Sequence, residues 1–441
     1  MKKVIASAGV LAAGTAALQA QYLPAGQAGR FWTASLAVRA FYDDNYFTYP
    51  SQGVPAGTDT IKPLDSFGIE VSPSIRYNLV RDQNTIQGAY TYSMKYYQDR
   101  GDEPIDGSHD LSVLIDHRFS ERYRGKLSEQ FVYSQEPDVN VGTATTSPIR
   151  RGDNSYAHNL ANLDFSGVVT RTFGVRGTYQ NSFYDYKDDK DFYDPDAPGP
   201  SLSGLLDRIE QNFDLAAQWL KDERTKFSLG YGLNLANYTS DDVISDGPLP
   251  NAVPPPPGSD VARGTDRSSI AQRGYLGFEK TLANRIEVRG RAGAEFTSYD
   301  FEFSENSQNP YVEISGSYEY QRGSKLTLGV LHHRSATDVA GTSGTNITQD
   351  AVATLGYIDL SHKITAKTTA RVLWQVQNSL FSGGDADGES DNFYTLALSL
   401  DYRINEHWAA ELGYTWDRLD SFTATRSYSR NRVFIGTRLT Y

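Results

Sequence analysis

The sequence predicts an all-β fold: a transmembrane, antiparallel, up-and-down β-barrel of about 18 strands. About eighteen stretches of roughly 10 residues alternate apolar with polar side chains, which gives each strand one apolar and one polar face. The connections between these stretches are alternately long and short. No segment has the roughly 18 consecutive apolar residues that a membrane-spanning helix needs. These observations favour a barrel with short periplasmic turns at one end and long extracellular loops at the other.

The second stretch shows the alternation clearly. Its apolar face carries Phe67, Ile69, Val71, Ile75, Tyr77 and Leu79, and its polar face carries Glu70, Ser72, Ser74, Arg76 and Asn78. A soluble β-sandwich would show the same local pattern, so one stretch does not separate the two folds. The number of stretches, their length and the hairpin rhythm match membrane-spanning strands and favour the barrel.

The other elements follow in order along the chain. The first strand is expected at about 32–42, and tight turns are expected at 80–83 and 120–122. Further tight turns, rich in charged or small residues, are expected near 170–172, 221–224, 280–284, 321–324, 361–363 and 403–406. The longest loops are expected at 185–207 and 239–267. The fourteenth strand, near 351–360, has apolar residues on both faces, and without it the barrel would have sixteen strands.

The first residues predict a secretory signal peptide over 1–20. Lys2 and Lys3 form a basic start, an apolar stretch follows, and Ala20 suits the cleavage site. Residues 21–30 would then form a short periplasmic linker, too short for a plug domain, and 31–441 would form the barrel. The predicted location is the outer membrane of a Gram-negative bacterium, in contact with lipid and lipopolysaccharide.

The last predicted strand, at 430–441, also alternates. Val433, Ile435, Leu439 and Tyr441 lie on one face. An aromatic residue at the end of an alternating strand resembles the C-terminal recognition signal of bacterial outer-membrane proteins. The resemblance implies that Tyr441 is read by the barrel assembly machinery.

The segment Tyr42-Asp43-Asp44-Asn45 follows the first strand, where Asp43 and Asn45 suit a turn. The segment resembles the Tyr-Asp-Asp-Asn motif near the start of the putative β-barrel porin 2 family of Gram-negative outer membranes. With Tyr441 and the Tyr-rich hairpins, the resemblance extends over about residues 30–441. It implies an outer-membrane barrel and supplies no catalytic residues.

The charges are unevenly distributed along a chain whose formal net charge is −12. Nearly all of the expected outer loops are net acidic, whereas the strands and turns together are mildly basic. Charges facing lipid cost several kcal/mol, so those on the strands should face a water-filled lumen. The expected channel lining is Arg39, Glu70, Arg76, Lys95, Asp116, Arg118, Arg176, Arg289, Arg291, Glu295, Arg371, Glu411, Arg432 and Arg438. The sequence leaves open whether these groups line an open channel or close it with ion pairs.

Aromatic residues gather near the predicted strand ends, where rings with a polar tip suit the lipid–water boundary. Two girdles are therefore expected from Trp32, Tyr42, Tyr77, Tyr96, Trp219, Tyr299, Tyr320, Trp374, Tyr402, Trp408 and Trp416. A sugar-binding aromatic track is the alternative interpretation. It ranks second because most of these residues share the lipid-facing phase of their strands.

The sequence gives little support for metal binding, catalysis or nucleic-acid binding. Acidic clusters at 185–196 and 385–391 offer oxygen ligands for Ca²⁺, but the EF-hand spacing is absent, so neither a metal site nor a cofactor is expected. Ser134 and His158 are the nearest approach to a catalytic pair, and the sequence does not place them on one face. The acidic composition disfavours nucleic-acid binding.

The sequence therefore predicts a porin-like passive channel for small hydrophilic solutes. A non-conducting structural or accessory barrel, serving exopolysaccharide export or surface attachment, is the alternative. An outer-membrane hydrolase ranks third.

Overall fold

The computed structural model describes residues 31–52, 54–56, 59–101, 103–136, 155–189, 192–193, 199–245, 261–301, 304–340, 347–423 and 425–441. The predicted signal peptide and linker, at 1–30, lie outside these residues.

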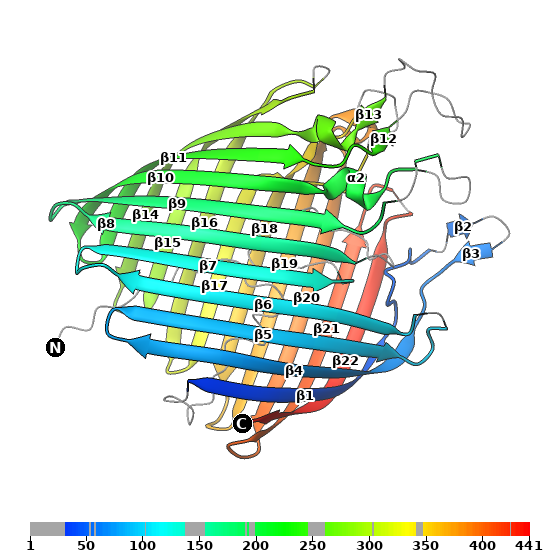
Figure 1. Ribbon diagram of the computed structural model, residues 1–441, viewed down its shortest axis with the longest axis horizontal. Helices are drawn as coiled ribbons and strands as arrows, with labels where there is room; N and C mark the ends of the chain where they lie inside the picture. Colours follow the sequence, from blue (N-terminus) through cyan, green and yellow to red (C-terminus); the bar gives the residue numbers. More distant parts are fainter. Residues whose placement is uncertain are drawn as a thin grey trace.

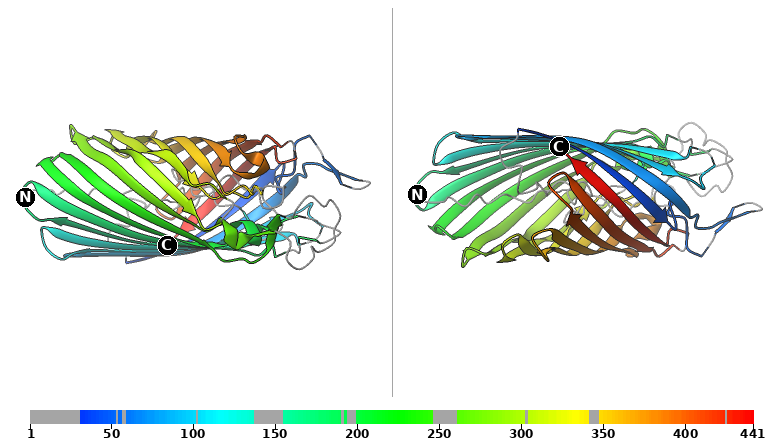
Figure 2. Two further views of the ribbon diagram at one scale, coloured as in Figure 1. Left: turned by 90° about the horizontal axis from the view of Figure 1, so that it is seen from above. Right: turned by 90° about the horizontal axis from the view of Figure 1, so that it is seen from below.

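Eighteen antiparallel strands form one closed sheet in the described part of the chain, which confirms the predicted fold. The strands are β1 (Trp32–Asp43), β4 (Ser66–Arg81), β5 (Asn84–Tyr97), β6 (Ile105–Arg118), β7 (Tyr123–Ser134), β8 (Tyr156–Val168), β9 (Phe173–Tyr186), β10 (Arg208–Asp222), β11 (Thr225–Tyr238), β14 (Ser269–Leu282), β15 (Ile286–Tyr299), β16 (Ser307–Gln321), β17 (Ser324–Ser335), β18 (Asp350–Lys363), β19 (Thr368–Ser382), β20 (Ser390–Arg403), β21 (Trp408–Asp420) and β22 (Tyr428–Thr440). Each strand pairs with its neighbours in sequence, and β1 pairs with both β4 and β22, which closes the barrel (Figures 1 and 2).

The short connections lie at one end of the barrel, called the turn end here, and the long ones at the other, called the loop end (Figure 1). The loop end carries the small hairpins β2 (Val54–Ala56)–β3 (Asp59–Ile61) and β12 (Val243–Ser245)–β13 (Ala262–Arg263). It also carries helix α2 (Leu202–Leu206) and the 3-10 helices η1 (Gly264–Arg267) and η2 (Gly384–Ala386). In the described residues, no helix is both long and apolar enough to cross a membrane.

The uncertain fourteenth strand is present as β18, so the count of eighteen is confirmed. The turn expected at 361–363 is wrong by a few residues. β18 continues to Lys363 because its ladder with β19 holds as far as Lys363 opposite Thr369. The turn follows at 364–367, where the Thr365 hydroxyl accepts the backbone N–H groups of Lys367 and Thr368.

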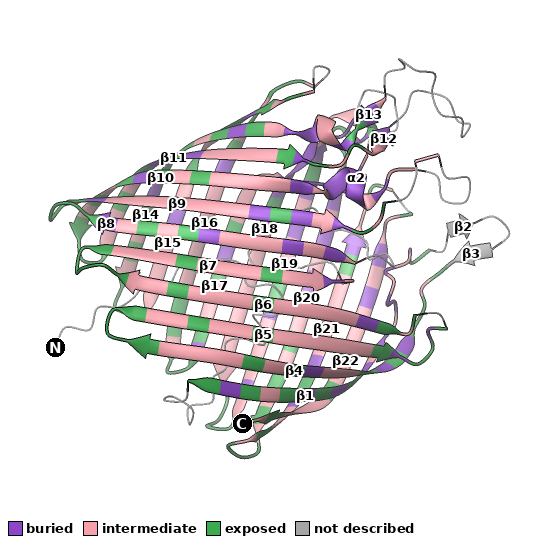
Figure 3. Cartoon of the chain, viewed as in Figure 1, coloured by how far each residue is buried: buried purple, intermediate pink, exposed green. Residues whose placement is uncertain are grey.

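Side chains alternate between the outer and inner faces of the wall, as the exposure pattern along the strands shows (Figure 3). Leu215, Leu276 and Ile435 leave about two-thirds of their surface exposed on the outer face, where a membrane would cover them. The aromatic girdle prediction is wrong for Tyr299. This ring lies on the inner face, where its hydroxyl donates to Asp350 at 2.6 Å, because Tyr299 shares the phase of the buried Glu295 and Thr297 on β15.

Candidate channel lining and loop end

A cavity of about 350 Å³ runs along the inner face of the wall from β8 to β18. Arg267 and Gln349 line it at the loop end, and Ser228, Glu279 and Arg289 line it toward the turn end. The cavity therefore extends over most of the height of the barrel on this side.

Three ion pairs near the turn end of this cavity are loose, and their side chains are partly exposed. Lys226 lies 3.4 Å from Glu279, Arg291 lies 3.9 Å from Glu313, and Arg289 lies 3.8 Å from Glu287. These six side chains expose between 29% and 38% of their surface. Groups so weakly paired and partly exposed can interact with water and solutes inside the barrel.

Two tyrosines of the same wall stand opposite glycines, and the ring of one of them lies over its glycine. Tyr275 on β14 stands opposite Gly230, where a Cβ would overlap its ring, and its hydroxyl donates to Asp214 at 2.7 Å. The Arg291 guanidinium lies 5.2 Å from the centre of the Tyr275 ring. Tyr311 on β16 stands opposite Gly293, and its hydroxyl donates to Glu313. The missing side chain at Gly230 leaves room for the Tyr275 ring against the wall.

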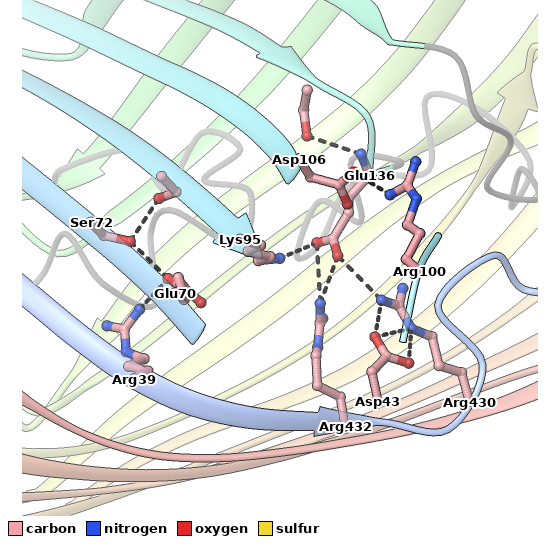
Figure 4. Close-up of polar contacts among 12 residues, drawn as sticks. Arg39, Asp43, Glu70, Ser72, Lys95, Arg100, Asp106, Glu136, Arg430 and Arg432 are labelled. Carbon is pink, nitrogen blue, oxygen red and sulfur yellow. Dashed lines mark hydrogen bonds and ion pairs between the residues drawn. The ribbon is translucent and has the colours of Figure 1, made fainter. Parts of the chain in front are cut away.

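The opposite wall carries a chain of tighter ion pairs. Arg39 on β1 contacts Glu70 at 2.6 Å and Glu411 at 2.7 Å, and Figure 4 shows the Arg39–Glu70 pair. Arg438 on β22 extends the chain, since it lies 2.7 Å from Glu411 and 3.2 Å from Asp401. The charges alternate in sign from the middle of the barrel to the turn end.

Glu136, in the loop after β7, is the centre of a second network at the loop end. Its carboxylate accepts from Lys95 at 2.8 Å, from Arg432 at 2.9 Å and from Arg430 at 3.2 Å (Figure 4). Arg430 also pairs with the fully buried Asp43. The network joins a loop to side chains of β1, β5 and β22, so Glu136 fixes that loop against the inner wall.

The structure brings most of the predicted lining residues into these groups. Arg39, Glu70, Glu411 and Arg438 share one network, Lys95 and Arg432 meet at Glu136, and Arg176, Arg289, Arg291 and Glu295 line the large cavity.

The other predicted residues lie apart from these groups. Asp116 pairs with Arg124 near the turn end, where Arg118 is exposed. Arg76 lines a separate recess of about 50 Å³ with Arg438, and Arg371 stands opposite Ser399 on β20.

A packed cluster of loop residues covers part of the loop end, and the sequence analysis missed it. Leu205 and Leu206 of α2 pack with Ile244, from the β11–β14 connection, and with Ala336 and Ile347, both from the β17–β18 connection. Apolar residues spaced irregularly in loops carry no periodic signal, so only the tertiary structure shows this cluster.

Two arginines hold the segment 336–340 in this cluster. Arg267 of η1 is 1% exposed, and its guanidinium donates to the carbonyl oxygens of Leu205, Thr337 and Val339. Burial lowers the pKa of Arg267 from its ordinary value. Arg426, in the loop before β22, donates to both carboxylate oxygens of Asp338 at 2.8 and 2.9 Å. The segment is thereby tied to loops from two different parts of the barrel.

Asp207 lies between α2 and β10 and accepts hydrogen bonds from the Tyr186 backbone N–H at 2.7 Å and the Ser203 hydroxyl at 2.9 Å. Burial raises the pKa of Asp207 to about 6, and the nearby carboxylates of Asp185 and Asp189 act in the same direction. Asp207 therefore gains or loses its proton at a pH that the protein, and with it α2, can meet in solution.

The family-like motif connects the first strand to the last. Both oxygens of Asp44 accept from Asn431, one from its backbone N–H and one from its amide. The amide of Asn45 donates to the carbonyls of Tyr49 and Ser429, and Asp43 pairs with Arg430. Tyr42 faces outward and donates to Asp65. At the turn end, the backbone of Tyr441 pairs with that of Ala34. The motif thus fastens the seam where β1 meets β22.

Residues considered for other chemistry have structural contacts instead. His158 stacks on Tyr184 with ring centres 4.1 Å apart, and the Ser134 hydroxyl accepts from the Glu136 backbone N–H. Within the described ranges, no three His, Asp or Glu side chains are placed to hold a metal ion. Part of the acidic cluster at 185–196 lies outside those ranges.

Several solved structures resemble the barrel. They include a BenF-like porin from Pseudomonas fluorescens Pf-5, with 11% identity and a TM-score of 0.42 over 93% of this chain and 99% of that one. OccK2 (OpdF) of Pseudomonas aeruginosa in complex with glucuronate has 11% identity and a TM-score of 0.41 over 93% and 98%. The siderophore receptor PirA from Acinetobacter baumannii has 9% identity and a TM-score of 0.43 over 93% and 80%.

No curated protein matches the chain. The family Putative beta-barrel porin 2 matches residues 318–441, which run from near the end of β16 through β22. This is the family that the Tyr42-Asp43-Asp44-Asn45 motif indicated. The chain is therefore an 18-stranded antiparallel β-barrel, and its residues 318–441 match the family Putative beta-barrel porin 2.

Proposed function

We propose that this barrel is a passive channel for small hydrophilic solutes. The observation that carries the proposal is the cavity along β8–β18, which reaches from the loop end toward the turn end between polar, partly exposed side chains. Hydrophilic walls of this kind hold water and allow polar solutes to pass without a specific carrier step. Of the predicted lining residues, Arg176, Arg289, Arg291 and Glu295 would act as the charged part of that wall.

The two sides of the barrel contribute differently to this function. The tight ion pairs around Arg39 and Glu136 neutralise their own charges and stiffen the β22–β1–β4–β5 wall. The loose pairs around Arg289, Arg291 and Glu279 leave charges free to meet a solute. The solute path is therefore expected along the β8–β18 wall, with acidic loops at the outside and weak overall ion selectivity.

The proposal also includes how the chain is exported, inserted and oriented in the outer membrane. The signal peptide would be cleaved near Ala20, and the barrel assembly machinery would insert the chain with the aid of Tyr441. The loop end would face lipopolysaccharide outside the cell. The barrel would act without catalysis.

Planar-bilayer recording of the purified barrel tests the proposal. Stepwise conductance is expected, with a small cation preference at low salt that fades near 1 M, where the Debye length is ~3 Å. A barrel that inserts as a heat-modifiable band yet shows no conductance would overturn the channel function. That result would favour the second candidate, a non-conducting accessory barrel, for which the packed loops at 199–207 and 336–340 are the specific observation.

A further inference from the structure

Four carboxamide side chains form a row across the inner face of β8–β11. In the strand registers, Asn162 stands opposite Gln180, Gln180 opposite Asn212, and Asn212 opposite Asn234. All four residues line the large cavity. Because these positions are paired between neighbouring strands, the four side chains form a continuous row across the inner face of this wall.

The row leaves hydrogen-bonding capacity free. Asn162 is only 4% exposed, yet neither its amide nitrogen nor its amide oxygen has a hydrogen-bond partner among the described residues. Asn234 donates to the Oδ1 atom of Asn212 at 2.7 Å, while Gln180 makes only a long contact of 3.4 Å with Ser182. A buried polar group without a partner costs free energy, which a ligand can recover by bonding to it.

The four carboxamides carry no charge, and the nearby carboxylates are already hydrogen-bonded to other side chains. On the side toward the turn end, Asp164 accepts from Arg176 at 2.7 Å and Asp214 accepts from Tyr275. On the side toward the loop end, Glu210 accepts from the buried Arg208 at 2.6 Å. A carboxamide offers donors beside an acceptor, which matches the neighbouring hydroxyl groups of a polyhydroxylated molecule.

We propose that Asn162, Gln180, Asn212 and Asn234 form a binding site for neutral, polyhydroxylated solutes of sugar type. This inference rests on the proposed function, since a solute reaches the row only through the lumen. The row selects by paired donors and acceptors, so a solute of equal size that only accepts hydrogen bonds binds weakly.

The test uses sucrose as the probe and measures its interruption of the ion current in planar bilayers. A poly(ethylene glycol) of matching size serves as the control solute. Wild type should bind sucrose measurably, and Asn162→Leu/Asn212→Leu should weaken sucrose binding by about ten-fold or more, because two amides are lost. The single variant Asn162→Ser keeps one hydroxyl and should show an intermediate effect even if the double variant folds poorly.

A matched control lies on the other face of the wall. Asn378 donates to Asn392 at 3.0 Å in the same kind of amide pair, but on the outward phase of β19 and β20. Asn378→Leu should leave sucrose binding unchanged. Equal sucrose binding in wild type and Asn162→Ser, or equal interruption by sucrose and the control polymer, would overturn the site while conductance persists. Absence of any wild-type conductance would instead remove the channel function itself, and the site with it.

Discussion

Arg426 and Asp338 show how a single pair of residues ties two loops together at the loop end. Their side chains are 15% and 5% exposed, and they form a bidentate pair between loops that lie far apart in the sequence. Arg267 holds the same segment through backbone carbonyls alone. The segment 336–340 is therefore held by two guanidinium groups. That of Arg426 is neutralised by the carboxylate of Asp338, whereas that of Arg267 binds backbone carbonyls only.

Arg426→Gln should release this segment. Removing one partner of a buried pair leaves the other charge uncompensated and costs about 3–5 kcal/mol. A cysteine introduced at Ala336, which is 8% exposed in a chain without native cysteine, should then react faster with a thiol reagent, and single-channel conductance should rise. Arg418→Gln is the control, because its pair with Asp420 is about half exposed. An unchanged reaction rate at position 336 in Arg426→Gln would refute the role of the pair.

Asp207 predicts a pH dependence at α2. Its pKa of about 6 lies above the ordinary value of 3.8, so folding favours the protonated form. The stabilisation is fully present below about pH 4 and is lost as the pH rises through 6. Hydrogen exchange at Gly204–Leu206, corrected for intrinsic rates, should be more protected at pH 5 than at pH 7.5. Asp207→Asn should abolish this difference, and a difference that persists in Asp207→Asn would assign it to another group.

At the scale of the strand, glycine decides where large inner side chains lie. Gly230 faces Tyr275, Gly329 faces Tyr357 and Gly68 faces Phe41, and a Cβ at any of these positions would overlap the facing ring. Glycine weakens a strand, so its use here has a compensating benefit in packing. The rings lie along the wall and leave the lumen wider than their size would otherwise allow.

Gly230→Val should narrow the lumen. The added side chain displaces the Tyr275 ring from the wall and breaks its hydrogen bond to Asp214, so conductance should fall by roughly two-fold. Gly167→Val is a matched control, since Gly167 faces the ring of Tyr123, which is 39% exposed on the outer surface. Both variants should lose about 1–3 kcal/mol of stability through overpacking, but only Gly230→Val should change conductance. Equal conductance in the two variants would contradict this account of the wall.

At the scale of the whole molecule, closure of the barrel depends on the seam between β1 and β22. Asp43, Asp44 and Asn45 bond to residues of the last strand that lie 384–387 positions away in the sequence. A closed sheet has no exposed edge, so the seam protects both terminal strands from pairing with other chains.

Asp43→Asn should destabilise the closed barrel. Asp43 is fully buried against Arg430, so loss of its charge should cost about 3–5 kcal/mol and lower the temperature at which the heat-modifiable band converts to the unfolded form. Asp82→Asn, in a pair with Arg81 that is 80% and 87% exposed, should change stability by less than about 0.5 kcal/mol. Equal unfolding temperatures for the two variants would show that the Asp43 pair does not hold the seam.

The sequence predicted the features that depend on local patterns and missed those that depend on contacts between distant segments. Strand number and lumen-facing phase were predictable because a period of two is a local pattern. The partners of Glu136 and Arg426 were not, since they join loops to distant segments with no repeating pattern. Beyond its family resemblance, the motif 42–45 was expected only to form a turn, because its partners on the last strand lie far away in the sequence. Tyr299 was assigned to the girdle by its place near a strand end, although its phase on β15 faces the lumen.

The central claim is that solutes pass along the inner face of β8–β18, and single-cysteine labelling tests it most directly. The native chain has no cysteine, so one introduced at Ser228, which lines the cavity, is the only reactive thiol. Adding a charged methanethiosulfonate reagent during bilayer recording should lower the current of Ser228→Cys. The same reagent should leave Leu229→Cys unchanged, because Leu229 is 64% exposed on the outer, lipid-facing surface. A steady current in Ser228→Cys, with labelling confirmed by mass spectrometry, would contradict passage along this wall.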